Sequence, residues 1–211
     1  MRLGCGGCLG TLLLVILLLG LAGGALWAVG GVLGRPDLPS LAGPAGDPLS
    51  AERKLSELIG RRRSRAPVVL TEGEVTALLA RRLPEAADLP LRGLVVRLPG
   101  AGTVEVAGAI PLQALARGTQ LAGVVGALPQ AWRDRPVWLR LRARPRVEEG
   151  AIRRYLRLDV DRFFLGRQRL PVFVLRLLLD PAALSMLRWP LPSGIAAVDA
   201  ETGRVVIRPG S

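Results

Sequence analysis

The sequence has no histidine among its 211 residues. This absence excludes Ser-His-Asp and Cys-His catalysis, histidine metal ligation and histidine-based pH switching. Lys54 is the only lysine among 29 basic residues, which face 17 acidic ones, so the net charge of +12 is carried by arginine. Aromatic residues make up 4% of the chain, which is too few for the stacking platforms that bind single-stranded nucleic acids.

Carboxylates are the remaining candidates for catalysis, and one pair, Asp159 and Asp161, falls in a strand pattern. The ~3.3 Å rise per strand residue places their Cα atoms roughly 6.5 to 7 Å apart. Arg153 and Arg157 lie beside them and keep both carboxylates ionised, the opposite of what a general acid needs. The sequence lacks a phosphate-binding glycine loop, a nucleophile elbow and a metal-spaced cluster. We therefore expect a protein that is not an enzyme and that has no cofactor and no metal.

The only two cysteines, Cys5 and Cys8, lie near the N-terminus with two glycines between them. A Cys-x-x-Cys pair is typical of redox and zinc sites, but a second pair and a histidine are both lacking. The residues ahead of Cys5 do not provide the hydrophobic region of a lipobox. The remaining alternative is a pair of small thiols at a membrane surface, free or acylated. No disulfide is expected in the rest of the chain.

A run of 32 residues without charge extends from Leu3 to Gly34. About 20 apolar residues span a bilayer, so this run predicts a transmembrane anchor within residues 1–34. Trp27 suits the far membrane interface. The alternative is a cleaved signal peptide with Ala22-Gly23-Gly24 as its small-residue site, but the apolar run continues ten residues beyond that site.

The charges that flank this run predict its orientation. The N-terminal side carries the α-amino group and Arg2, whereas Arg35 beyond the run is offset by Asp37. The positive-inside rule favours a cytoplasmic N-terminus, a single span of the plasma membrane and an extracytoplasmic C-terminal domain. Residues 35–47 form a Pro/Gly-rich linker, which at ~3.1 Å per residue can hold the domain about 40 Å from the bilayer. The domain, residues 48–211, carries the whole charge excess of +12.

Two helices are predicted at the start of the domain. Asp47 is placed to cap the first. Thr71 and Glu74 form a capping box at the start of the second, and Pro84 is expected to end it. We expect these helices over residues 48–60 and 72–83.

The rest of the domain alternates between strand and helix patterns. We expect a β-hairpin from residues 94–98 and 103–110 with a Pro99-Gly100 turn, then loose helix over 112–132 and a strand pair between 136 and 163. A connector over 163–171 follows, and it leads to a helix over 173–179. The chain is expected to end with a capped turn that reaches Trp189 and a closing hairpin from 195–199 and 204–208. The apolar helix 173–179 is too short to span a membrane, so it is interpreted as a core helix. The predicted fold class is α+β, with a curved antiparallel sheet packed on helices behind the N-terminal transmembrane helix.

The strand pair between residues 136 and 163 has one apolar and one cationic face. The apolar face includes four leucines that we expect to be buried: Leu139, Leu141, Leu156 and Leu158. The cationic face is the candidate binding site for anionic lipid or anionic envelope polymer: Arg140, Arg142, Arg144, Arg146, Arg153 and Arg157. We expect the first three of these arginines to be exposed, and residues 61–65 to assist. Arginine contacts phosphate and carboxylate bidentately, and so acid-poor a domain cannot pair every arginine in the row. The alternative is an ordinary solvated face, partly neutralised by acids such as Asp159.

Several short motifs follow one another in a definite order. They are an N-terminal span, Thr71 to Glu74 followed by ValThrAlaLeuLeu, paired strands, a Gly-x-x-x-Leu-Pro-Val segment at Gly166 to Val172, a late LeuProSerGly and a terminal hairpin. This order resembles the uncharacterised YpmS-like membrane-anchored proteins over most of residues 1–211. The resemblance implies an extracytoplasmic domain of unknown activity, with a curved sheet wrapped on a helix as in relatives of lipid-binding tubular folds. It supplies no catalytic residues.

Together these features predict a membrane-anchored binding protein for lipid or anionic envelope components. One alternative is a structural or adaptor subunit that has a protein partner in the membrane. A less favoured alternative is a nucleic-acid-binding protein, which the pI of about 11.5 suggests but the low aromatic content does not support. The interior of the domain discriminates between the first two, because a cavity lined by Val and Leu favours lipid and a filled core favours an adaptor.

Overall fold

The computed structural model describes residues 30–32, 34, 46–59, 66–87, 90–119, 122–150, 153–178, 184–185, 187–192 and 194–210. Within these ranges no helix is both long and apolar enough to cross a membrane. The anchor predicted for residues 1–34 lies almost entirely outside them, as do most of the linker 35–47 and the basic run 61–65.

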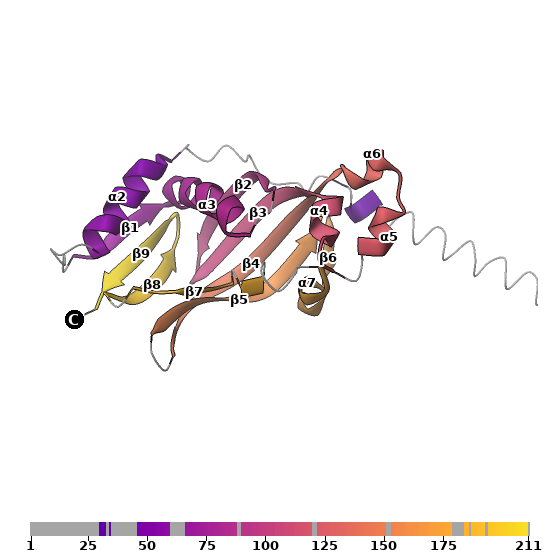
Figure 1. Cartoon of the computed structure of the whole chain (residues 1–211). Helices are drawn as coiled ribbons and strands as arrows, with labels where there is room; N and C mark the ends of the chain where they lie inside the picture. The colour runs from indigo at the N-terminus through magenta and orange to yellow at the C-terminus, as the bar shows by residue number, and fades with distance from the viewer. Residues whose placement is uncertain are drawn as a thin grey trace, which may run out of the picture.

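The described residues form an α+β fold with two antiparallel sheets (Figure 1), which confirms the predicted class without its transmembrane helix. The larger sheet has the order β2-β3-β4-β5-β6, with β7 also paired to β5, and the smaller has the order β1-β9-β8. The strands of the larger sheet are β2 (Arg92–Gly100), β3 (Thr103–Pro111), β4 (Pro136–Glu149), β5 (Arg154–Leu165), β6 (Gln168–Leu170) and β7 (Arg188–Pro190). Those of the smaller are β1 (Val68–Thr71), β8 (Ile195–Glu201) and β9 (Arg204–Pro209).

Two helices, α2 (Pro48–Ile59) and α3 (Glu72–Ala87), lie at the same end of the molecule as the smaller sheet (Figure 1). The predicted caps are confirmed: the Leu49 N–H donates to Asp47 Oδ1 over 3.0 Å, and the Glu74 N–H donates to Thr71 Oγ1 over 3.3 Å. The prediction that Pro84 ends the second helix is wrong, because α3 continues to Ala87. Proline removes one helical hydrogen bond but leaves the following residues free to complete a last turn.

The short helices between β3 and β4 match the loose helical segment that was predicted. They are α4 (Leu112–Ala116), α5 (Ala122–Gly126) and α6 (Gln130–Arg133). Gly118 has a φ of 74° after α4, and Pro129 is the N-cap of α6. The glycine and proline breaks of the sequence therefore fall where the helices end or begin.

The first hairpin turns two residues later than the sequence suggested. Gly100 pairs with Thr103, so Ala101 and Gly102 form the turn and Pro99 lies within β2. Both turn residues have positive φ, 53° at Ala101 and 67° at Gly102, as in the mirror-image turns that suit the twist of a hairpin.

The β4–β5 pair is the longest in the molecule and contains one irregularity. Arg142 pairs with Arg162 while Ala143 pairs with Val160, so Asp161 is an extra residue on β5. This bulge shifts the alternation by one position and brings Phe163 into the core. Residues 163–165 therefore belong to β5 and pair with β6, and the connector predicted over 163–171 is wrong.

The C-terminal part is partly as predicted. The apolar helix is α7 (Val172–Leu178), whose Leu175 and Leu178 are buried, as a core helix requires. The closing hairpin is β8–β9. The prediction that a capped turn reaches Trp189 is wrong, because Trp189 lies in strand β7 opposite Leu156 of β5.

Buried side chains form two clusters at the two ends of the molecule. One includes Leu70, Val96, Leu98 and Ile207, and it packs beneath α2 and α3. The other includes Ile110, Val137 and Phe163 with residues of α4 and α7. Backbone hydrogen bonds join the two sheets, since the Gly102 N–H donates to the Ala200 carbonyl oxygen and the Gly203 N–H donates to that of Leu98.

Candidate functional site

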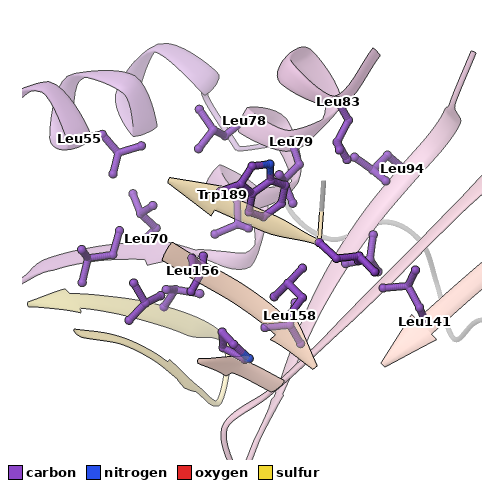
Figure 2. A pocket seen from close by; sticks show the side chains of 18 of the residues that line it. Leu55, Leu70, Leu78, Leu79, Leu83, Leu94, Leu141, Leu156, Leu158 and Trp189 are labelled. Carbon is purple, nitrogen blue, oxygen red and sulfur yellow. The ribbon is translucent and has the colours of Figure 1, made fainter. Parts of the chain in front are cut away.

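An apolar cavity of about 400 Å³ lies between the two core clusters (Figure 2). Helices α2 and α3 border it with Leu55, Val75, Leu78, Leu79 and Leu83. The sheets border it with residues from β1 to β5 and β7 to β9, among them Val106, Leu141, Leu156, Leu158, Trp189 and Val198. All the lining residues that the structure describes are apolar, and none of these is charged.

Strict strand alternation creates this wall. Val106 on β3 pairs with Leu141 on β4, and both side chains line the cavity. Side chains at paired positions point to the same face of a sheet, so each strand contributes every second residue. We expected Leu139, Leu141, Leu156 and Leu158 to be buried on one sheet face. All four line the cavity on that face, but only Leu139 is buried. The other three are half-buried because they face the cavity and not a filled core.

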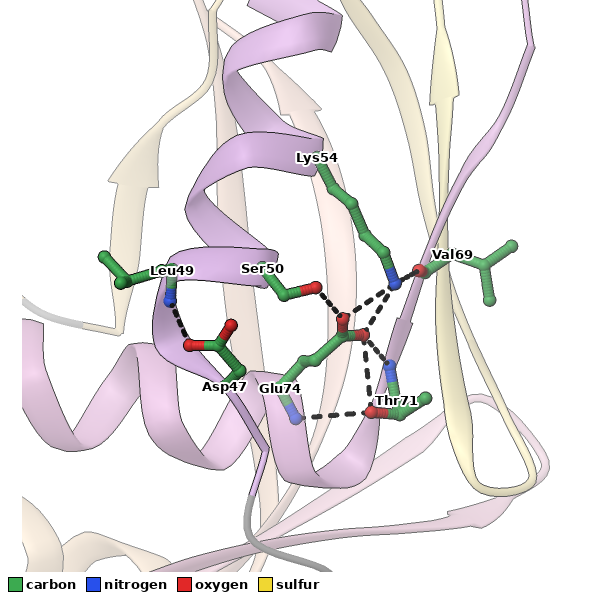
Figure 3. Close-up of polar contacts among 7 residues, drawn as sticks. All are labelled: Asp47, Leu49, Ser50, Lys54, Val69, Thr71 and Glu74. Carbon is green, nitrogen blue, oxygen red and sulfur yellow. Dashed lines mark hydrogen bonds and ion pairs between the residues drawn. The ribbon is translucent and has the colours of Figure 1, made fainter.

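A polar network fixes the two helices that border the cavity (Figure 3). Glu74 is 7% exposed and accepts hydrogen bonds from Lys54 Nζ over 2.9 Å, the Thr71 N–H over 2.9 Å and Ser50 Oγ over 2.9 Å. Burial alone would raise the pKa of Glu74, but these hydrogen bonds and the charge of Lys54 lower it from 4.5 to about 2. The ionised carboxylate therefore ties α2, β1 and α3 together.

Helix α3 also covers the free edge of the larger sheet. Glu72 Oε1 accepts the Leu98 N–H, and Thr76 Oγ1 accepts the Val96 N–H over 3.0 Å. Side chains one helical turn apart thus bind alternate N–H groups of β2, which an edge strand would otherwise leave unpaired. The helix is held against the rim of the cavity by polar contacts, while its leucines face the apolar wall.

The candidate arginines lie on the opposite face of the larger sheet, as predicted, but not all of them are free. Arg140 stacks on Phe164, with its guanidinium carbon 4.1 Å from the ring centroid. Arg142 lies 3.9 Å from Glu105 and its buried Nε has no hydrogen-bond partner. Both are half-buried, so the expectation that they are exposed is wrong, whereas Arg144 is exposed as expected.

The other candidate arginines have ion-pair or hydrogen-bond partners. Acidic side chains therefore neutralise more of the arginine row than the sequence suggested. Arg146 lies 3.3 Å from Asp159, and Arg157 contacts both Glu148 over 2.8 Å and Asp159 over 2.9 Å. The hydrogen bond and charge of Glu148, together with the charge of Asp159, raise the pKa of Arg157. Arg153 donates to the Tyr155 hydroxyl over 3.2 Å. Asp159 thus lies between the guanidiniums of Arg146 and Arg157.

The sheet register adds four arginines to this face that the sequence reasoning did not include. Register places Arg97 and Arg162 in the cross-strand row of Arg142, Arg169 in the row of Arg140, and Arg188 in the row of Arg146 and Arg157. The alternation of Arg97 with Leu94, Val96 and Leu98 was a usable signal. Arg162 follows the bulge, so no strict period could place it. Arg153 precedes the first residue of β5 and belongs to none of these rows. We call the other nine arginines, 97, 140, 142, 144, 146, 157, 162, 169 and 188, the arginine face.

A second, mixed cavity of about 460 Å³ adjoins the apolar one. Its wall includes Glu148, Arg157, Asp159 and Arg188, and it shares Leu158 and Leu187 with the apolar cavity. Among the described residues these two leucines border both cavities, so they mark the boundary at which the apolar wall meets charged side chains.

No protein-family model matches the chain, and no curated protein matches it significantly. The resemblance to the YpmS-like proteins therefore remains a prediction based on motif order. Among the described residues, no three or more Cys, Asp or Glu side chains are grouped so that they could hold a metal ion.

Proposed function

We propose that this protein is a membrane-anchored, extracytoplasmic lipid-binding protein and not an enzyme. The apolar cavity holds acyl chains, and the arginine face meets anionic lipid headgroups or anionic envelope polymer. The anchor is the uncharged run Leu3 to Gly34, which places the domain on the outer side of the plasma membrane.

The observation that carries the proposal is a cavity of about 400 Å³ that the described part of the chain lines with apolar residues alone. Natural ligand cavities fall in the range of about 300–1,000 Å³, and most contain a few polar groups that orient a polar ligand. A wall without such groups fits a ligand that has none, such as a hydrocarbon chain. Each CH₂ group kept out of water contributes about 0.8 kcal/mol, so the cavity can shield an acyl chain from water as the bilayer interior does.

The cavity also favours lipid binding over the adaptor alternative. An adaptor needs only a filled core, and half-buried leucines that face an open space are costly without a ligand. Leu141, Leu156 and Leu158 are half-buried because they face such an open space, the cavity. The neighbouring mixed cavity, with Arg157 and Glu148 in its wall, lies where a polar headgroup would emerge beside the chain.

Native mass spectrometry of the full chain tests the proposal. The protein is released from detergent micelles after incubation with dipalmitoyl phosphatidylglycerol, and we expect a bound species of one lipid mass. Val106→Trp fills the cavity and should remove this species. Val95→Trp is the matched control. It changes a valine of the neighbouring strand β2 on the opposite face of the sheet, and this variant should retain the bound lipid. Equal retention by both variants would contradict acyl-chain binding in the cavity.

A further inference from the structure

An uncharged surface is exposed at the end of the molecule opposite α2. Residues 122–132 contain no charged side chain, and nine of these eleven residues are exposed. Val124 on α5 is 66% exposed and Trp132 on α6 is 41% exposed. Exposed aliphatic and aromatic side chains on adjoining short helices are unusual for a surface that faces only water.

Helix α7 adds a third large apolar residue at this end (Figure 1). Phe173 is 63% exposed, whereas Leu175 two residues later is buried in the same core cluster as α4. The described part of the chain has five large hydrophobic residues that are exposed, and three of them lie at this end. The other two, Leu49 and Val69, lie on α2 and β1 at the far end.

The last residues of the uncharged run Leu3 to Gly34 contact the domain at this same end. The Arg167 N–H donates to the Gly31 carbonyl oxygen over 2.8 Å, and Val32 packs against the core cluster that contains Phe163. Gly166 makes this approach possible, because its φ is 58° and an added Cβ would lie 2.2 Å from the Val32 carbonyl oxygen. Gly31 and Val32, near the end of the run, are therefore docked on the β5–β6 turn.

Basic residues flank the uncharged surface. Arg133 and Arg135 follow Trp132 in the chain, and the Arg135 guanidinium carbon lies 5.8 Å from the Trp132 ring centroid. Arg169 on β6 is exposed, next in the chain to Gln168, whose side chain lies close to Gly31. Tryptophan among arginines at the rim of an apolar patch is typical of protein surfaces that sit in the headgroup layer of a membrane.

We propose that α5, α6 and Phe173 form a membrane-docking surface that rests on the outer leaflet of the bilayer. This inference rests on the anchor of the proposed function, because a spanning run that ends near Gly34 emerges from the membrane beside the β5–β6 turn. The partner is the phospholipid surface and not a second protein, since the docked end of the run places this patch at the point of emergence. With this surface on the bilayer, the domain does not stand about 40 Å from the membrane.

Depth measurements with nitroxide labels on the full chain test this surface. Cys5 and Cys8 are changed to Ser, single cysteines are introduced as Val124→Cys, Trp132→Cys and Phe173→Cys, and the protein is reconstituted in vesicles of phosphatidylcholine and phosphatidylglycerol. Leu49→Cys and Val69→Cys are the matched controls, because they are exposed apolar positions at the far end. All five positions are exposed, so the labels should not disturb the core.

We expect labels at 124, 132 and 173 about 5–10 Å below the headgroup surface, where oxygen collides with them more often than a water-soluble nickel complex. Labels at 49 and 69 should show the reverse. An aqueous signal at all five positions in protein that stays in the vesicles after alkaline carbonate would overturn the docking surface while leaving the anchor intact. Release of the protein by carbonate would instead refute the anchor and the docking surface together.

Discussion

Leu158 and Asp159 are neighbours in β5 and both border the mixed cavity, but Leu158 also lines the apolar cavity, whereas Asp159 lies between Arg146 and Arg157. A single peptide bond thus separates the surface proposed for acyl chains from the surface proposed for anionic groups. The period-2 alternation of a strand makes this separation possible, and the long β4–β5 pair extends it across the sheet.

The Glu74 network should stabilise the border of the cavity. Glu74→Ala leaves Lys54 and the Thr71 N–H without their shared partner, so we expect a loss of about 2–4 kcal/mol in the free energy of unfolding at pH 7. Urea unfolding of residues 30–211 measures it. Glu57→Ala, on α2 but exposed, is the control and should change stability by less than about 0.5 kcal/mol. A similar small loss for Glu74→Ala would mean that the network does not hold the helices.

The same carboxylate predicts a pH dependence of stability. Its pKa is lowered from 4.5 to about 2 in the folded protein, so its stabilising effect is complete above pH 4.5 and is lost as the pH falls toward 2. This shift corresponds to about 3 kcal/mol. Unfolding midpoints in urea between pH 6 and 2 should fall more steeply for the natural chain than for Glu74→Gln. Parallel curves for the two proteins would contradict the assigned pKa.

Truncation of leucines should separate the filled core from the cavity. Leu98 is 1% exposed, so Leu98→Ala should cost about 2–5 kcal/mol, as a core truncation does. Leu156→Ala removes the same atoms from a half-buried wall and should cost markedly less, about 1 kcal/mol, because an open space already lies beside it. Denaturant unfolding of the two variants gives the comparison. Equal losses would indicate that the cavity is closed by packing in solution.

The arginine face should bind anionic vesicles in a salt-dependent way. Each arginine near an anionic surface contributes roughly 1 kcal/mol, and the attraction decays over about 8 Å at physiological salt. We expect residues 30–211 to co-sediment with phosphatidylglycerol vesicles, and the change of Arg140, Arg142, Arg144 and Arg146 to Gln to weaken binding at least tenfold. The control variant changes the same number of arginines to Gln outside the arginine face. These are Arg53 on α2, Arg81 and Arg82 on α3, and Arg204 on β9.

Two results of this experiment would refute the arginine face as a binding surface: equal weakening by both sets of changes, or equal retention on phosphatidylcholine vesicles. Far tighter binding to duplex DNA at the same salt concentration would favour the nucleic-acid alternative.

Local signals in the sequence predicted much of the fold. The Thr71–Glu74 capping box and the alternation in β4 and β5 act over a few residues, and both are confirmed. The turn at Ala101-Gly102 was missed because Pro99-Gly100 is the stronger turn signal. Trp189 in β7 was missed because its pairing with Leu156 is a long-range contact that no local period records.

The candidate site was predictable in part for the same reason. Alternation assigned the arginines and leucines of β4 and β5 to opposite faces. The bulge at Asp161 changes the period by one residue, so the sequence could not place Arg162. The cavity depends on how far α2 and α3 stand from the sheets, and this distance depends on long-range contacts such as those of Lys54 with Val69 and of Thr76 with Val96.

The most direct test of the central claim is photo-crosslinking of the reconstituted full chain with a phosphatidylcholine that carries a diazirine on its acyl chain. We predict adducts on peptides that contain Leu78, Leu79 or Leu141, their loss in Val106→Trp and their retention in Val95→Trp. Adducts within residues 1–34 serve as the internal control for insertion. Labelling of residues 1–34 without any adduct on the cavity wall, or equal wall labelling in both tryptophan variants, would contradict acyl-chain binding in the cavity.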